Sequence, residues 1–224
     1  MEIGLNRSKL SDTIQCEGLC FKKDMNDIYN IFHDIFMKKE NRPLYKGKFI
    51  FFNMNRDINI MNNGIKIVQK LSKPERFLHI ISLNNDGKKY NVNPCSNDDA
   101  IEFCKNECNL HNSNLSEFKS INRTECYYRL MRINRIPEVI NLANEKDSNI
   151  REWTEVEKDK KNNKIHKRYI RYKHKRDDYV VILKEVYKRG VLNNYEFITA
   201  FPLFKRDDKS EYDKKYDKYI KKIK

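Results

Sequence analysis

The chain has 224 residues, of which 39% are hydrophobic and 12% aromatic, and this excludes wholesale disorder because a core can be built. No apolar run approaches the roughly 18 residues of a membrane span. The first twenty residues also lack the apolar core of a signal peptide. A net charge of +14 favours a polyanionic partner. We therefore expect a soluble, cytoplasmic protein of one large or two small domains that does not bind membranes.

The positive charge is concentrated in one stretch. An A/T-rich genome enriches Lys and Asn everywhere and would raise the charge evenly. Between Lys158 and Arg176, however, ten basic residues stand against one acidic residue, which gives +9 of the net +14. Tyrosines lie among these cations, as in surfaces that stack nucleic-acid bases. The residues expected to contact nucleic acid are Lys164, Lys167, Tyr169, Tyr172, Lys173 and Lys184.

The first third of the chain is predicted to be mostly helical. Apolar residues at steps of three and four predict a helix over 24–39. A short apolar run predicts a strand over 49–52, and a second helix is expected over 63–71, before Pro74. Residues 75–83 have the composition of a strand that ends in a turn.

The last hundred residues predict a different architecture. Four segments rich in Ile, Val, Tyr and Phe are separated by turn-like sequences, which favours an antiparallel meander. A helical pattern over 124–145 is interrupted by Pro137, and a polar helix is expected over 208–224. The four expected strands are 150–156, 165–172, 179–185 and 195–201.

The expected fold class is therefore α+β. A mostly helical N-terminal segment would precede a helix that packs on a four- to five-stranded antiparallel sheet. We place a domain boundary between residues 1–74, of unknown role, and residues 75–224. The cysteine-containing stretch at about 93–126 is expected to be an insertion in the second domain.

Five short segments of the second half occur in a recognisable order. They are Arg76–Ile80 (RFLHI), Arg132–Ile136 followed by Val139-Ile140, Trp153, Val180–Leu183 and Ile198–Pro202 (ITAFP). This order resembles the phage- and mobile-element-associated nucleases of the barnase–EndoU–colicin–RelE-like superfamily. The resemblance covers roughly residues 75–205, and ITAFP is its most specific part. It implies a small toxin-like ribonuclease, with RNA as substrate and a cognate immunity or antitoxin protein as a partner.

Metal-independent RNA cleavage needs a base for the ribose 2′-hydroxyl, an acid for the leaving oxygen and cations for the transition state. His79 matches the histidine of the family-like HI pair and is our candidate general acid/base; the alternative is an ordinary hydrogen-bonded histidine. Thr199, within ITAFP, is a candidate phosphate contact, although Thr also suits strands well. Strand alternation predicts that Thr199 faces the same side as Phe197 and Phe201.

The basic strand supplies further candidates. Alternation places Lys167, Tyr169 and Arg171 on one face and His166 and Arg168 on the other. Arg171 is our first choice for the transition-state cation, with Arg168 and His166 as alternatives. Glu155, near the end of the Trp153 strand, is a candidate carboxylate base. For each of these residues, a solvated sheet face is the competing interpretation.

The cysteines form a second cluster. Cys104, Cys108 and His111 share one face if they lie on a helix, and Cys126 or Cys95 could supply a fourth ligand. Four such ligands suit a structural zinc and leave no open position for catalysis. Buried free thiols are the alternative. Catalysis itself is expected to need no cofactor.

The leading functional prediction is a ribonuclease that cleaves RNA by general acid/base catalysis. The alternative is a non-catalytic nucleic-acid-binding module, which zinc could stabilise. A third hypothesis is a basic interaction protein whose charge reflects genome composition alone.

Overall fold

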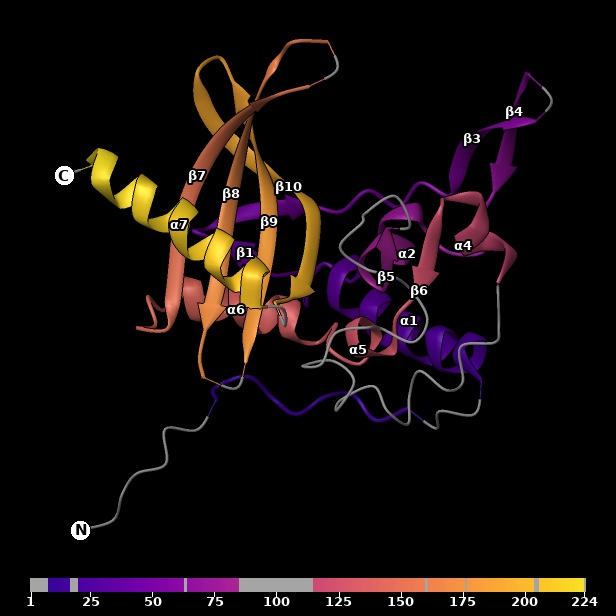
Figure 1. The fold of residues 1–224 in the computed structure, drawn as a ribbon, viewed down its shortest axis with the longest axis horizontal. Coiled ribbons are helices and arrows are strands. Elements are labelled where there is room, and N and C mark those ends of the chain that lie inside the picture. Colours follow the sequence, from indigo (N-terminus) through magenta and orange to yellow (C-terminus); the bar gives the residue numbers. More distant parts are fainter. Residues whose placement is uncertain are drawn as a thin grey trace.

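The computed structural model describes residues 8–16, 20–62, 64–84, 115–159, 161–175, 177–203 and 206–223. Figure 1 shows two parts side by side, a twisted sheet with helices on both faces and a group of short helices with two small sheets. The expected mixture of helices and strands is confirmed.

Four consecutive strands form the predicted antiparallel meander. They are β7 (Ile150–Lys158), β8 (Lys164–Lys173), β9 (Asp178–Lys188) and β10 (Val191–Pro202). The turn between β9 and β10 uses Arg189 and Gly190, both with positive φ, and glycine adopts that conformation without strain. All four strand predictions are confirmed.

The sheet is larger than expected and is not wholly antiparallel. The N-terminal third supplies β1 (Leu44–Tyr45) and β2 (Lys48–Phe51), and β2 pairs in parallel with β10, placing Ile50 opposite Tyr195. The strand order is β1-β2-β10-β9-β8-β7. The expected four- to five-stranded antiparallel layout therefore fits only roughly, because the sheet has six strands and one parallel pair. Local pattern cannot reveal a pairing between residues almost 150 positions apart. The domain boundary at residue 74 stays a prediction.

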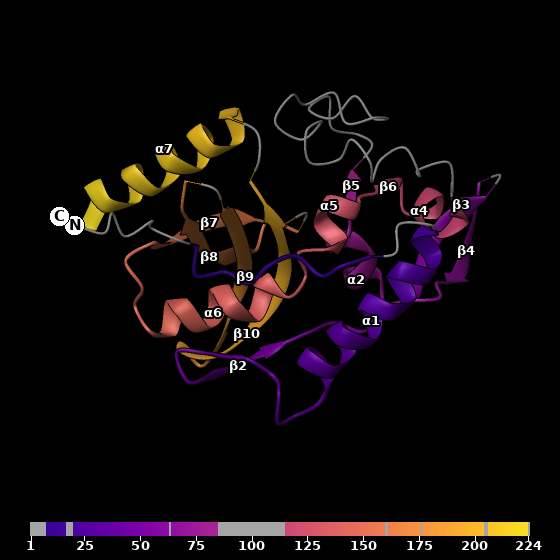
Figure 2. The ribbon, with the colours of Figure 1, turned by 90° about the horizontal axis from the view of Figure 1, so that it is seen from below.

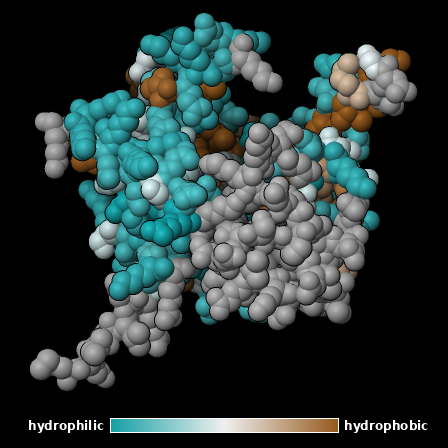
Figure 3. Space-filling model, viewed as in Figure 1, coloured by the Kyte–Doolittle hydropathy of each residue, from teal (hydrophilic) through white to brown (hydrophobic). Residues whose placement is uncertain are grey.

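The N-terminal third is also less helical than predicted. The expected helix over 63–71 is wrong, because β3 (Asp57–Asn62) and β4 (Ile65–Lys70) form a hairpin there. Gly64, at φ +80°, follows an asparagine in the turn, and Asn-Gly is a strong hairpin signal. Isoleucines of this hairpin remain exposed, which gives it the hydrophobic colour in Figure 3.

The strand expected over 75–83 is a helix at its start. Pro74 precedes α2 (Glu75–Ile80), and only β5 (Ser82–Asn84) is extended, in a pair with β6 (Arg123–Glu125). A run of six residues is too short for periodicity to separate a helix from a strand. In the folded chain, the consecutive residues Phe77 and Leu78 are both buried in the main core, which suits a helix better than a strand with one buried face.

The remaining helices agree more closely with the sequence. The expected helices over 24–39 and 208–224 are confirmed as α1 (Phe21–Met37) and α7 (Arg206–Ile223). The helical pattern over 124–145 divides into α5 (Tyr127–Leu130) and α6 (Arg135–Asn144). Pro137 lies in the first turn of α6, where its missing N–H costs little. A further short helix is α4 (Ser116–Ser120).

Figure 2 shows the sheet between two helices, with α6 on one face and α7 on the other. On the α6 face, Ile170, Val181 and Phe197 join the main core, which continues into α1, α2 and α5. On the α7 face, Trp153, Tyr169 and Ile182 form a smaller cluster. Within the described residues, no helix combines the length and apolarity required to cross a bilayer.

Five phenylalanine rings pack against one another where the two parts meet. The Phe32 ring of α1 lies 4.8 Å from the rings of Phe36 and Phe52 and 5.0 Å from that of Phe77. Phe52 in turn stacks on Phe197 of β10 at 4.4 Å. Phe32 is fully buried in this close-packed cluster, so removal of its ring would leave a cavity.

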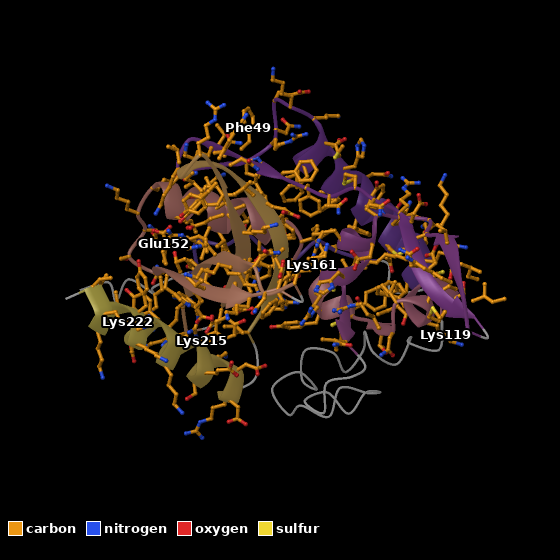
Figure 4. All side chains as sticks on the ribbon, turned by 90° about the horizontal axis from the view of Figure 1, so that it is seen from above. Phe49, Lys119, Glu152, Lys161, Lys215 and Lys222 are labelled. Carbon is orange, nitrogen blue, oxygen red and sulfur yellow. The ribbon has the colours of Figure 1, made fainter. Side chains whose placement is uncertain are left out.

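We predict that Phe32→Ala lowers the free energy of unfolding by about 3–5 kcal/mol, because it removes a ring from the centre of the aromatic cluster. Urea denaturation followed by circular dichroism measures this loss. The matched control is Phe49→Ala on β2, since the Phe49 side chain is 56% exposed and points to solvent (Figure 4). Equal losses in the two variants would contradict the assignment of the core.

Candidate functional site

The strand β10 changes its register within the ITAFP segment. Phe197 lies opposite Leu183, yet Thr199 lies opposite Ile182, so a bulge interrupts the ladder at Ile198. A bulge inserts one residue and reverses the alternation that follows. Thr199 therefore faces α7, opposite to Phe197, and the predicted common face of these two residues is wrong. Phe201 shares the new face of Thr199, with its ring 6.2 Å from Tyr212 of α7.

Three arginines and His79 gather beside this bulge. Arg76 of α2 donates from Nη1 to the carbonyl oxygen of Ile198 at 2.7 Å, which ties α2 to β10 directly before Thr199. Arg129 of α5 donates to the Ser82 carbonyl at 2.9 Å, and its guanidinium lies 5.2 Å from the centre of the Phe201 ring. We call Arg76, Arg123 and Arg129 the arginine cluster.

Arg123 of β6 completes the arginine cluster. It donates to Oγ of Ser82 at 2.7 Å and to the carbonyl oxygens of Ser82 and His79 at 2.8 and 3.1 Å. All of these acceptors are neutral. In the described part of the chain, no carboxylate forms an ion pair with Arg76, Arg123 or Arg129. Among the described residues, these three positive charges are thus oriented by hydrogen bonds to neutral groups, and Glu75 of α2 acts on Arg123 only through space.

The positive charge of the arginine cluster lowers the pKa values of the basic groups within and beside it. Burial and the charge of Arg129 lower the pKa of Arg123 to about 10, so this guanidinium stays protonated at neutral pH in an unfavourable potential. Burial, followed by the charges of Arg123, Arg76 and Arg129, lowers the pKa of His79 to about 3. His79 is therefore a neutral imidazole at neutral pH. A bound anion would relieve the potential at all four groups.

Several polar atoms at this place are buried without hydrogen-bond partners among the described residues. They are Nε of Arg76, Nε of Arg129 and Oγ1 of Thr199. An unsatisfied buried polar group costs about 1–3 kcal/mol, so its presence in a folded protein asks for an explanation. Donors of this kind around an uncompensated positive potential match the oxygens of a phosphate group.

Two further buried arginines, Arg132 and Arg135, follow between α5 and the first turn of α6. The guanidinium of Arg132 lies 3.5 Å from the ring centre of Tyr128, and Arg135 pairs with Asp177 at 2.7 Å. Burial raises the pKa of Tyr179, and the positive charges of Arg129, Arg135 and Arg132 offset part of that rise. These three arginines therefore all act on Tyr179 of β9.

The predicted catalytic residues do not form one site. Arg171, Thr199 and Glu155 lie on the α7 face, whereas Arg168 and His166 lie on the α6 face, as the alternation in β8 predicted. His79 lies off the sheet, on α2. The structure therefore brings His79 and Thr199 toward the same arginines and leaves the other candidates apart from them.

Each of the other candidates already has a partner. Arg171 is fully buried, with bonds to both carboxylate oxygens of Asp178 at 2.7 and 2.6 Å. Arg168 donates twice to Glu185, at 3.0 and 2.8 Å. Glu155 accepts from the indole of Trp153 at 3.2 Å. His166 contacts the ring of Tyr187, 5.4 Å away.

The expected nucleic-acid contacts are also largely committed within the protein. Tyr169 and Tyr172 are buried, so neither ring lies on an open surface, and their contact with nucleic acid stays a prediction. Lys167 pairs with Glu157, and Lys184 pairs with Glu196. Lys173 binds Asp213, and Lys164 is exposed.

Of the residues expected to bind zinc, Cys126 is described, and it is buried directly before α5. Cys95, Cys104, Cys108 and His111 lie outside the described residues. Among the residues that are described, no group of three His, Cys, Asp or Glu side chains is placed to hold a metal ion.

Sequence reasoning missed the arginine cluster. Its members come from α2, β6 and α5, and the chain between β5 and α4 separates the first from the other two. A signal was present for one member, because arginine is the minority basic residue in this lysine-rich chain, yet it recurs at positions 129, 132 and 135. Nothing local to Arg76 or Arg123 indicates that they join Arg129. Arg is preferred over Lys where several donors must bind a phosphate in a fixed geometry.

Comparison with known proteins gives no independent assignment: no protein-family model, curated protein or solved structure matches the chain.

We predict that His79 stays neutral down to about pH 4. Its folded pKa of about 3 lies below the ordinary value of 6.5, so the unfolded chain takes up this proton first as the pH falls. The contribution of His79 to stability is therefore complete above about pH 6.5 and is lost toward pH 3, by at most about 1.4 kcal/mol per pH unit. NMR titration of the imidazole measures the pKa.

The control variant for this titration is His79→Asn, which cannot take up a proton. It should remove part of the pH dependence of urea unfolding between about pH 4 and 6. A measured pKa of His79 near 6.5 would contradict the electrostatic description of the arginine cluster.

Proposed function

We propose that this protein is a metal-independent ribonuclease that binds the scissile phosphodiester at the arginine cluster. The observation that carries the proposal is the group of three arginines with no carboxylate partner among the described residues, placed around a neutral His79 and the unbonded hydroxyl of Thr199. The resemblance of RFLHI and ITAFP to the nuclease superfamily supports the same two residues.

In the proposed reaction, the ribose 2′-oxygen attacks the adjacent phosphorus and loses its proton, while the bond from phosphorus to the 5′-oxygen breaks. His79 takes the proton of the 2′-hydroxyl, and the leaving 5′-oxygen takes a proton from solvent water. The products are a 2′,3′-cyclic phosphate and a 5′-hydroxyl, and the His79 imidazolium then returns its proton to the hydroxide left by that water. Thr199 donates to a non-bridging oxygen. Arg76 and Arg129 stabilise the additional negative charge of the transition state.

A histidine with a pKa of about 3 is a weak base, and bound substrate would make it a stronger one. Burial is the largest cause of the low pKa of His79, and the positive charges of Arg123, Arg76 and Arg129 add to it. A bound phosphodiester offsets part of that positive charge and thereby raises the pKa of His79. His79 would therefore be a stronger base when RNA occupies the cluster than when the cluster is empty.

The alternative, a non-catalytic nucleic-acid-binding module, uses the same cations and differs in needing neither His79 nor Thr199. The hydroxyl of Thr199 is buried and has no hydrogen-bond partner among the described residues, so it adds nothing to stability, and this favours a role in catalysis over a role in binding alone.

We predict that Thr199→Val lowers the rate of RNA cleavage in EDTA by about 100-fold, because one donor to the transition state is lost. The free energy of unfolding should stay equal or rise by about 1 kcal/mol, since valine has the same shape without an unsatisfied hydroxyl. The measurements are cleavage of a labelled RNA oligonucleotide and urea denaturation of the same preparations.

The matched control is Thr154→Val on β7, which makes the same chemical change at a partly buried position on the opposite face of the sheet. It should cleave RNA at the wild-type rate, and an all-DNA oligonucleotide should not be cleaved because it lacks the 2′-hydroxyl. Cleavage that requires a divalent metal, or wild-type activity in Thr199→Val, would contradict the proposal.

A further inference from the structure

The α7 face of the sheet carries a second group of cations beside stacked aromatic rings. Arg151 and Arg171 are neighbours on β7 and β8, and Lys173 follows on β8. In the adjacent row, the indole of Trp153 lies flat against the Tyr169 ring, with centres 4.9 Å apart and planes at 6°. Cations next to flat aromatic rings are the usual components of a single-stranded nucleic-acid site.

One carboxylate of α7 occupies the centre of these cations. Asp213 accepts from Arg151 at 2.6 Å, from Arg171 at 3.0 Å and from Lys173 at 2.8 and 2.9 Å. A phosphodiester carries the same single negative charge and also presents two oxygens to donors. Asp213 therefore stands where an RNA phosphate would fit.

The aromatic rings are covered by the same helix. Tyr212 and Tyr216 place their rings edge-on to Trp153, each at 6.0 Å between centres. Arg151 lies 5.2 Å from the centre of the Tyr216 ring. Figure 1 shows α7 crossing the front of β7, β8 and β9, so it covers the cations and the rings together.

The attachment of α7 is mostly polar. None of its residues from Arg206 to Ile223 is buried, so it adds little to the hydrophobic core. Its second half carries Lys215 and Lys222 (Figure 4). Lys215 pairs with Glu155 of β7 at 3.6 Å, and a partly exposed pair of this kind contributes little to stability. An open cavity of about 470 Å³ lies between this part of α7 and β7.

The covered face is continuous with the arginine cluster. Thr199, Ile182, Tyr169 and Trp153 form one row across four strands. Phe201 lies beside that row, with Arg129 on one side and Tyr212 of α7 on the other. Removal of α7 would thus extend the proposed cleavage site into a longer groove.

We propose that α7 is an autoinhibitory strap that RNA displaces, with Asp213 occupying a phosphate position and Tyr212 and Tyr216 covering the surface on which bases stack. This inference rests on the proposed function, since it takes RNA as the ligand. RNA strand and helix compete for one face, and the lysines of α7 remain available to the RNA backbone after displacement. Displacement would also release Nη1 of Arg171 from Asp213.

The full chain provides the test. Asp213→Asn removes the phosphate-like charge, Tyr216→Ala removes an aromatic cover, and neither changes the sheet. Asp217→Asn is the matched control, because Asp217 lies on the same helix, is exposed, and makes no ion pair with the described residues. The probe is a labelled single-stranded RNA of mixed sequence, with binding followed by fluorescence anisotropy at several salt concentrations.

We expect Asp213→Asn and Tyr216→Ala to bind this RNA about tenfold more tightly than Asp217→Asn, because the fraction of molecules with an open face sets the apparent affinity. Affinity should also fall more steeply with salt as more phosphates are contacted. The protein has a single tryptophan, Trp153, so its emission reports directly on α7. It should shift to the red in both variants and in the wild type on addition of RNA.

Different results separate the two proposals. If the wild type binds and cleaves RNA but neither variant exceeds Asp217→Asn in affinity or in emission, the strap is wrong and the ribonuclease stands. If no variant binds RNA and none cleaves it, both proposals fail. Tighter binding of a polyglutamate peptide than of RNA would also overturn the inference, because a peptide without bases does not use the aromatic rings.

Discussion

The bulge in β10 at Ile198 is the constraint on which the arrangement of the candidate site depends. Without it, Thr199 would point into the main core beside Phe197, and Phe201 would lie away from α7. With it, the last residues of ITAFP turn toward Arg129 and Tyr212. The hydrogen bond from Arg76 to the Ile198 carbonyl holds α2, and with it His79, at the same place. The extra residue in β10 thus brings the end of ITAFP and the helix that carries His79 to the same place.

Two groups of buried cations differ in how their charge is compensated. Around Arg171, the carboxylates of Asp178 and Asp213 neutralise most of the charge, and the group is structurally complete while α7 stays in place. Around Arg129, the partners among the described residues are carbonyl oxygens and a hydroxyl, and the positive potential adds to burial in lowering the pKa of His79. Burial of charge without an ion-pair partner is costly. Under the proposed function, an anionic substrate would supply the compensating charge.

Elements whose identity rests on neighbouring residues were predictable. The meander follows from β-branched and aromatic residues bounded by turn sequences, and α1 follows from its apolar spacing. The predictions that failed lie at 63–71 and 75–83, which are short segments where helix and strand patterns overlap. In the first, the turn at Gly64 outweighed the helical spacing. In the second, packing of Phe77 and Leu78 into the core selected a helix.

By itself, the sequence determined the meander, the basic character of β8 and its alternation, and it singled out His79 and Thr199. All of these depend on properties that are local along the chain. Only the tertiary structure decided that β2 joins β10, that Arg76, Arg123 and Arg129 meet, and that Asp213 of α7 neutralises cations more than 35 residues earlier. Such contacts join distant parts of the chain, and their energies depend on burial and on compensation of charge, which no local pattern records.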